Sequence, residues 1–224
     1  MVLAETRARH HRPATGALGV TAARAPVVVG DLSALPDSVK GHKHLVWWGN
    51  LGFMLIGGTG FLLAAGCYLY LASQGRGWPP AGDRLPGLFW SGVFTAGLLL
   101  SELPNLWVRR RALADDARGV RIGALVMSVL GLVLIGIRWF ELQHLNAPWD
   151  VDAYGSVVWM LMILHTSHIV TDWGDTAVQA VWLYTHEIGD DQFADVEDNA
   201  NYWSFVVLAW PPIYLLVYWI PRWW

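Results

Sequence analysis

Five long apolar segments, separated by connections that carry helix breakers such as those in GRGWPPAGDRLPG and LNAPWD, constrain the fold of this chain most strongly. A helix that crosses the hydrocarbon core of a membrane needs about 20 largely apolar residues. The segments that meet this requirement run over residues 45–72, 87–108, 120–142, 154–184 and 201–220. Hydrophobic residues form 54% of the chain and charged residues only 15%, against about 25% in a soluble domain. We therefore predict an all-α polytopic membrane protein, with five transmembrane helices in one bundle over residues 44–224.

The first 43 residues differ from the rest, because they are rich in Ala, Arg, Pro and Gly and contain no apolar run of spanning length. Arg24 and Pro26 interrupt the most apolar part of this region. A secretory signal peptide would need a continuous apolar core there. We therefore expect residues 1–43 to form a flexible cytoplasmic tail.

The distribution of basic residues predicts the orientation of the helices. Eleven of the fifteen Lys and Arg residues lie in this tail or in the loop between the second and third segments, which reads RRRALADDARGVR. Short loops on the cytoplasmic side of a membrane protein are enriched in Lys and Arg. This rule places the N-terminus in the cytoplasm and the C-terminus outside.

Titratable side chains recur on one face of the fourth segment, at spacings of three, four and three residues. This polar seam consists of His165, His168, Asp172 and Asp175, and Gln179 and His186 continue it. At about 100° per residue, these positions share a narrow face of a helix. Such a face is costly in lipid, so it is expected to look into the bundle, towards a partner subunit or into water.

The residue types leave three interpretations of the seam open. In the first, the two His are neutral packing residues and the two Asp approach the cytoplasmic interface. In the second, the face meets another membrane subunit or a lipid headgroup. In the third, the His pair and a carboxylate bind a metal ion, because residues three apart on a helix can share a ligand. A single haem is disfavoured, since two His on one face cannot bind it from both sides.

Two further acids lie in or at the end of apolar segments. Glu141 follows Arg138 by three residues, and we expect the two to form a snorkelling pair at the membrane interface. Glu102 lies just before Pro104 in the second segment. We expect Glu102 to pair with the basic cluster around Arg109, and a role as a proton-relay group is the alternative.

Several classes of function find no support in the sequence. Cys67 is the only cysteine, so there is no disulfide framework, cysteine zinc site or iron–sulfur cluster. The chain has no Walker loop, dinucleotide-binding fingerprint or serine nucleophile elbow. A net charge of −3 gives no reason to expect a nucleic-acid partner. No self-contained catalytic site is predicted.

From residue 138 onward, the chain contains in order the motifs FELQHLNAPWDVDAYGS, LHTSHIV and NYWSFVVLAWPPIYLLVYWI. This order of motifs resembles subunit III of the haem–copper cytochrome oxidases. The residues that match in type and spacing are Glu141, Tyr154, Gly155, Ser156, His165, His168, Tyr202, Trp203, Phe205 and Trp210. With the first apolar segment, the resemblance covers residues 45–221.

The chain departs from the family pattern at several positions. Gly57 or Gly58 stands where the family usually has an intramembrane Glu, and Ser204 replaces a His. Asp172 and Asp175 are additional acids. The two N-terminal helices of longer members are absent, which removes one wall of a cleft that holds phospholipids in those members.

The resemblance implies a non-catalytic accessory subunit of a proton-pumping terminal oxidase in the inner membrane of a bacterial cell. Such a subunit binds no haem or copper itself, because these lie in its partners, the catalytic subunit I and subunit II. Membrane lipids are further partners, and a bound phospholipid is compatible with the family. The alternatives are an accessory subunit of a quinol oxidase or nitric oxide reductase, and a stand-alone membrane protein that binds metal or haem.

Overall fold

The computed structural model describes residues 45–74, 77–80 and 84–223, and within these ranges all regular secondary structure is helical. The helices are α1 (Leu45–Ala72), α2 (Leu88–Leu113), α3 (Ala117–Gln143), α4 (Ala153–Thr185) and α5 (Asp190–Tyr214), followed by the π-helix η2 (Leu215–Trp219) and the short α6 (Ile220–Trp223). The predicted all-α class is confirmed. The predicted tail, residues 1–43, lies outside the described residues.

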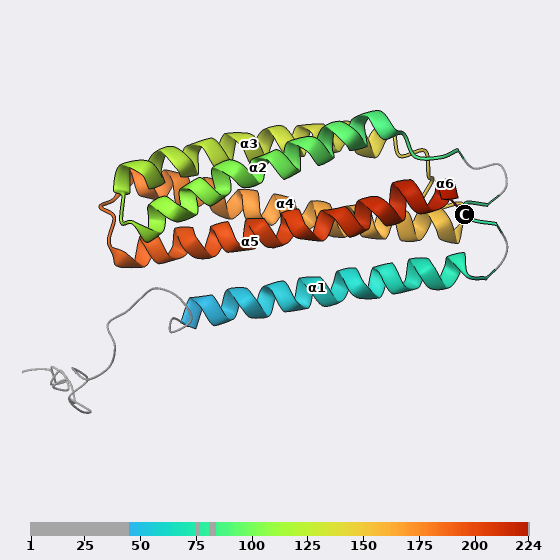
Figure 1. Cartoon of the computed structure of the whole chain (residues 1–224), viewed down its shortest axis with the longest axis horizontal. Helices are drawn as coiled ribbons and strands as arrows, with labels where there is room; N and C mark the ends of the chain where they lie inside the picture. Colours follow the sequence, from blue (N-terminus) through green and yellow to red (C-terminus); the bar gives the residue numbers. More distant parts are fainter. Residues whose placement is uncertain (1–44, 75–76, 81–83, 224) are drawn as a thin grey trace, which may run out of the picture. The chain divides into compact units, whose positions relative to one another are not determined.

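Among the residues that the structure describes, four helical segments are long and apolar enough to cross a membrane: Val46–Ala72, Ala117–Gln143, Ala153–Thr185 and Asp190–Trp223. Helix α2 is not among them, because Glu102, Pro104 and Asn105 interrupt its apolar part and Arg109–Arg111 occupy its last turns. It nevertheless runs alongside α3 and α5 as the fifth long helix of the bundle (Figure 1).

The helices pack as a group of four with the fifth on one side. Helices α2 to α5 pack against one another, and α1 packs against α4 and α5 (Figure 1). Large apolar side chains on the other side of α1, such as Ile56 and Leu62, are exposed. This distribution is typical of a helix whose outer face meets lipid or another membrane subunit.

Carboxylates at two helix starts fix the connections before α3 and α4. Asp116 accepts a hydrogen bond from the Gly119 N–H at 3.0 Å, and this bond, helped by the nearby Arg111, lowers the pKa of Asp116. Asp152 caps α4 in the same way, through the Gly155 N–H at 2.7 Å. Such caps satisfy backbone donors that have no partner within the helix.

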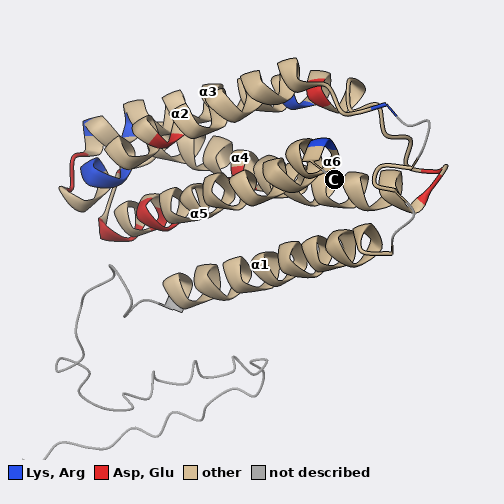
Figure 2. Cartoon of the chain, turned by 45° about the vertical axis from the view of Figure 1, so that its right-hand side comes forward, with Lys and Arg blue, Asp and Glu red and all other residues tan. Residues whose placement is uncertain are grey.

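Charged residues mark the end of the bundle where α2 leads into α3 and α4 leads into α5 (Figure 2). We call it the arginine-rich end. Its basic residues are Arg109, Arg110, Arg111, Arg118 and Arg121. Acidic residues of the first turns of α5 lie at the same end (Figure 2). Two polar regions of the bundle lie at different depths from this end.

Candidate functional site

The first polar region is a buried network centred on Arg138. The Arg138 side chain, 1% exposed, donates hydrogen bonds to Glu141 Oε2 and to His165 Nδ1, each at 2.8 Å. Glu141 Oε1 accepts a hydrogen bond from the Tyr218 hydroxyl at 2.6 Å. These four residues, which we call the buried network, connect α3, α4 and η2 through charge-assisted hydrogen bonds.

Two aromatic rings enclose the guanidinium group of the buried network. The Arg138 guanidinium carbon lies 3.6 Å from the centre of the Phe94 ring and 4.2 Å from that of Trp210. Ring faces attract cations, and they attract them more strongly where water is excluded. Phe94 and Trp210 belong to α2 and α5, so the network and its enclosing rings involve α2, α3, α4, α5 and η2.

The hydrogen bonds of His165 determine its protonation pattern. Its Nδ1 faces Arg138, which can only donate, so Nδ1 accepts. Its Nε2 lies 3.1 Å from the backbone oxygen of Val206, which can only accept, so Nε2 carries the proton. His165 is therefore a neutral imidazole that uses both ring nitrogens within the protein. It has no free lone pair for a metal ion, which argues against its part in the metal-binding interpretation.

Two expectations for intramembrane acids are wrong. Glu141 does pair with Arg138, but both side chains are 1% exposed, so they are enclosed by the bundle and do not snorkel. Glu102 accepts hydrogen bonds from Ser204 at 2.6 Å and Asn105 at 3.3 Å. Arg109, its expected partner, instead pairs with Glu197 of α5 at 3.8 Å.

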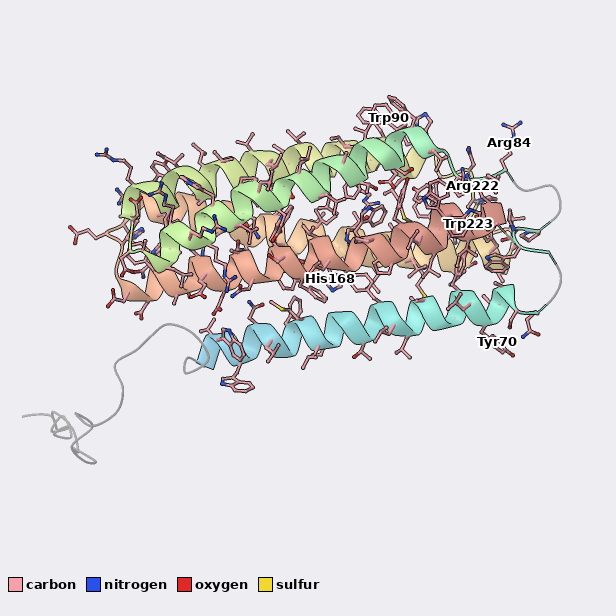
Figure 3. The ribbon with its side chains drawn as sticks, in the orientation of Figure 1. Tyr70, Arg84, Trp90, His168, Arg222 and Trp223 are labelled. Carbon is pink, nitrogen blue, oxygen red and sulfur yellow. The ribbon has the colours of Figure 1, made fainter. Side chains whose placement is uncertain are left out.

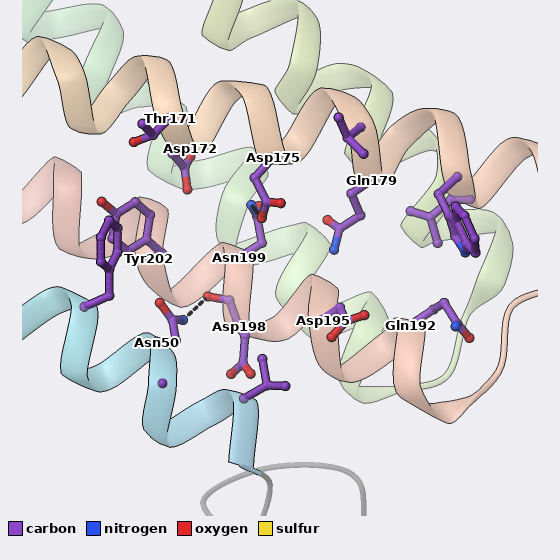
Figure 4. Close-up of a pocket in the computed structure, with 16 residues that line it drawn as sticks. Asn50, Thr171, Asp172, Asp175, Gln179, Gln192, Asp195, Asp198, Asn199 and Tyr202 are labelled. Carbon is purple, nitrogen blue, oxygen red and sulfur yellow. Dashed lines mark hydrogen bonds between the residues drawn. The ribbon is translucent and has the colours of Figure 1, made fainter.

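The second polar region is a cavity of about 760 Å³ between α1, α4 and α5, which we call the acidic cavity (Figure 4). Its acidic lining residues are Asp172, Asp175, Asp195 and Asp198. Among the described residues that line it there is no Lys, Arg or His. Residues at the start of α1 and α5 and at the end of α4 also line it, which places it towards the arginine-rich end.

Asp172 is the most enclosed acid of this cavity. Its side chain is 2% exposed, and neither carboxylate oxygen has a hydrogen-bond partner among the described residues. Asp175, one turn further along α4, accepts a hydrogen bond from the side-chain amide of Asn199 at 3.2 Å. Asn50 of α1 donates to the backbone oxygen of Asp198 at 2.7 Å, which joins α1 to α5 beside the cavity (Figure 4).

His168 lies against α1, on the side of α4 that faces this helix (Figure 3). Its Nδ1 is hydrogen-bonded to the Leu164 backbone oxygen at 2.7 Å, and its ring centre is 4.9 Å from that of Phe61. A Cβ atom at Gly57 would lie only 2.5 Å from His168 Nε2. The absence of a side chain at Gly57 therefore allows the imidazole to approach α1.

The seam that the sequence predicts is thus divided between two environments. His165 joins the buried network, whereas Asp172, Asp175 and Gln179 line the acidic cavity. His186, expected to continue the face, is not a lining residue and stacks on Trp182, with ring centres 3.8 Å apart. The periodicity of α4 places these side chains, but apart from neighbours on α4 itself, such as Trp182, their partners come from α1, α3 and α5.

Sequence reasoning did not identify Tyr218 as a partner of Glu141, nor Asp195 and Asp198 as neighbours of Asp172. One feature of the sequence could have indicated the grouping of these acids. Asp195 and Asp198 are three residues apart, as are Asp172 and Asp175, so each pair shares a helix face. The distance between the two faces depends on how α4 packs on α5, which spacing alone does not reveal.

Comparison with known proteins identifies the family. A family model described as cytochrome c oxidase subunit III matches residues 40–223. A cytochrome c oxidase subunit 3 from Synechocystis sp. is 23% identical over 181 residues, which cover 80% of this chain and 77% of the relative.

The chain belongs to the cytochrome c oxidase subunit III family. It is therefore a membrane subunit of an oxidase, and it assembles with other oxidase subunits. The resemblance drawn from the motif order of the sequence is confirmed.

The Tyr-Gly-Ser motif of this subunit III chain forms the start of α4. Tyr154 is buried and packs edge-on against Trp78, with ring centres 5.1 Å apart. A Cβ atom at Gly155 would collide with the backbone oxygen of Pro148. The Ser156 hydroxyl donates to the Trp149 backbone oxygen at 2.7 Å. The motif thus fixes the connection from α3 into α4.

The aromatic motif of α5 joins this helix to its neighbours. Trp203 donates to the Ser101 hydroxyl of α2 at 2.9 Å, and Trp210 donates to Thr95 of α2 at 2.8 Å. Tyr202 lines the acidic cavity, and the Phe205 ring centre lies 6.3 Å from that of His168. These aromatic residues pack α5 against α1, α2 and α4.

Proposed function

We propose that this chain is a non-catalytic accessory subunit of a proton-pumping haem–copper terminal oxidase in a bacterial inner membrane. Its partners are the catalytic subunit I and subunit II, which hold the haem and copper. The N-terminus is cytoplasmic and the C-terminus lies outside, as the excess of Arg at the arginine-rich end indicates. Membrane phospholipid covers the exposed apolar face of α1.

The observation that carries the proposal is the acidic cavity at the arginine-rich end. Four Asp side chains line it, and Asp172 is enclosed without a hydrogen-bond partner among the described residues. A concave site lined by one sign of charge raises the local concentration of the opposite ions, here including protons. The subunit would therefore assist proton uptake by its catalytic partner from the cytoplasmic side.

We further propose that this chain stabilises the catalytic subunit, a role that the buried network supports. Arg138 is paired with Glu141 and enclosed by Phe94 and Trp210, so the helices that carry these residues are held together. A bundle held in this way can present a defined surface to a partner. An accessory subunit needs such a surface, because ordering a mobile interface on binding costs free energy and so weakens the association.

Purification through an affinity tag on this chain in mild detergent tests the assembly. We expect mass spectrometry to identify subunits I and II in the purified complex, and a haem spectrum to establish the haem types present. Purification of the chain alone, with its own haem spectrum, would contradict the accessory role.

The Asp172→Asn/Asp175→Asn double variant tests the proton-uptake role. We expect slower proton uptake by the complex at unchanged content of this subunit, because two carboxylates of the acidic cavity are lost. Asp190→Asn/Asp191→Asn is the matched control, since both acids are exposed at the start of α5 and do not line the cavity. Wild-type uptake in the first variant, within an intact complex, would refute this role.

A further inference from the structure

Glu102 of α2 is a carboxylate at the middle depth of the bundle. It accepts a hydrogen bond at 2.6 Å from Ser204, which lies near the middle of Asp190–Trp223, a segment long and apolar enough to cross a membrane. The side chain of Glu102 is only half-buried. Its neighbours Leu99 of α2 and Leu208 of α5 are 46% and 73% exposed. An acid therefore reaches the outer surface of the bundle at a depth where the surroundings are apolar.

The groups of this chain that donate to Glu102 are a hydroxyl and a side-chain amide, and neither carries a charge. The amide, which belongs to Asn105, lies 3.3 Å from Glu102 but 2.9 Å from the backbone oxygen of Ala200. Arg109, the first cation after Glu102 in α2, pairs with Glu197 instead. Within the described ranges, no Lys, Arg or His forms an ion pair with Glu102. Its negative charge is therefore not balanced by any of these residues.

The depth of Glu102 determines what kind of partner can balance its charge. Ionisable side chains within a membrane are costly, and they face a bundle interior, a water-filled cavity or a partner with which they pair. Glu102 does not line the acidic cavity. Lipid headgroups lie at the two edges of a hydrocarbon core that is about 30 Å thick, so they do not reach its middle. The partner that fits is a cationic side chain on a membrane helix of another protein chain.

The surface of α2 beside Glu102 offers room for such a helix. Gly92, Ala96, Leu99 and Leu103 are spaced by four, three and four residues, so they share one face of α2, and Glu102 borders it. A Cβ atom at Gly92 would have no atom within 4 Å. Small residues four apart allow membrane helices to approach closely. Because α2 and α5 run side by side (Figure 1), a helix laid along them would cover Glu102.

We propose that the surface formed by Leu99, Glu102, Ser204 and Leu208, which we call the Glu102 face, binds a membrane helix of another oxidase subunit. This helix presents an Arg or Lys side chain to the Glu102 carboxylate. The proposal rests on the assembly of this chain with other oxidase subunits and not on proton uptake. It adds to the accessory role the side of the bundle that meets the rest of the oxidase.

Photo-crosslinking in the intact, tagged complex tests the position of the interface. The photoreactive amino acid p-benzoylphenylalanine replaces Leu99 or Leu208, and in the matched control it replaces Leu132, which is 55% exposed near the middle of α3. We expect adducts to another oxidase subunit from both positions of the Glu102 face, and adducts to lipid alone from Leu132.

Three outcomes of the crosslinking would overturn the proposal. Lipid adducts alone at Leu99 and Leu208 would show that no helix covers the Glu102 face. Adducts to a second copy of this chain would identify a different partner. Adducts to an oxidase subunit from Leu132, with none from the Glu102 face, would place the interface elsewhere and leave the accessory role intact.

Glu102→Gln tests the charge. The new side chain keeps an oxygen that can accept from Ser204, so the contact between α2 and α5 is retained. We expect the Kd of this subunit, measured by dilution of the purified complex in detergent, to rise by roughly tenfold or more. This is the factor expected for loss of a hydrogen bond between charged groups.

Two further variants keep the test decisive. Glu197→Gln is the matched control, since it removes the carboxylate that links α5 to Arg109 two turns away, and it should leave the Kd unchanged. Gly92→Leu keeps every charge but fills the open space on α2, so it should raise the Kd. A wild-type Kd in Glu102→Gln or in Gly92→Leu would overturn the proposal. An equal rise in Glu102→Gln and Glu197→Gln would also overturn it, because the effect would then come from contacts within the subunit.

Discussion

The two polar regions of the bundle are equally buried at their centres but differ in how their groups are paired. In the buried network, Arg138 is 1% exposed and hydrogen-bonded to Glu141 and His165. In the acidic cavity, Asp172 is 2% exposed and has no hydrogen-bond partner among the described residues. The charged groups of the network are paired with side chains of this subunit. The cavity is open, and a partner for its buried carboxylate has to come from outside the described residues.

This difference separates a structural role from a functional one. A paired charge enclosed by aromatic rings holds helices together, and removal of one partner leaves the other buried without compensation. An unpaired buried carboxylate contributes nothing to folding and is itself a cost. We therefore assign stability to the network and interaction with protons to the acidic cavity.

The largest effect is expected from Arg138→Met. The substitution leaves Glu141 buried without its cation, which should lower the free energy of unfolding by about 3–5 kcal/mol. A denaturant titration of the detergent-solubilised complex, followed at this subunit, measures the change. The double variant Arg138→Met/Glu141→Leu should recover part of the loss, because no unpaired charge remains. Arg110→Met, at an exposed position of α2, is the matched control and should have little effect.

Tyr218→Phe should have an intermediate effect. It removes the hydroxyl that donates to Glu141 Oε1 at 2.6 Å, and loss of a hydrogen bond to a buried charged group costs about 1–3 kcal/mol. Tyr70→Phe is the comparison, since Tyr70 is 66% exposed. Equal stability of the two variants in the same titration would show that the network does not hold η2 to α3.

A smaller effect is expected from Gly57→Ala, on the helix that borders the cavity. The new Cβ atom would lie 2.5 Å from His168 Nε2, so the imidazole must shift, and we expect a loss of about 1 kcal/mol. At Gly58 the nearest atom would be 3.8 Å away, in ordinary contact. Gly58→Ala should therefore be neutral. The same loss in both variants would contradict the close packing of His168 on α1.

The smallest effect on stability is expected from Asp172→Asn. Because the carboxylate has no hydrogen-bond partner to lose within the described residues, the free energy of unfolding should stay within about 0.5 kcal/mol or rise. The same titration measures it. A loss as large as that of Arg138→Met would remove the distinction between the two regions.

The sequence predicted the helical class because long apolar runs have few alternatives in a membrane. It also placed His165 and Asp172 on one face of α4, since helical periodicity is regular. The sequence did not reveal what each of these side chains contacts, because the contacts depend on how other helices pack on α4. His165 meets Arg138 of α3, whereas the space around Asp172 is formed by α1 and α5. The pairing of Arg138 with Glu141 followed from spacing, but its enclosure depends on rings from α2 and α5.

The most direct measurement is the rate of proton uptake by the intact oxidase complex carrying Asp172→Asn, normalised to its content of this subunit and paired with its denaturant titration. If the buried network provides stability and the acidic cavity serves proton uptake, this variant should take up protons more slowly, with a free energy of unfolding close to that of the wild type. Unchanged uptake together with a marked loss of stability would contradict it, because Asp172 would then serve the fold.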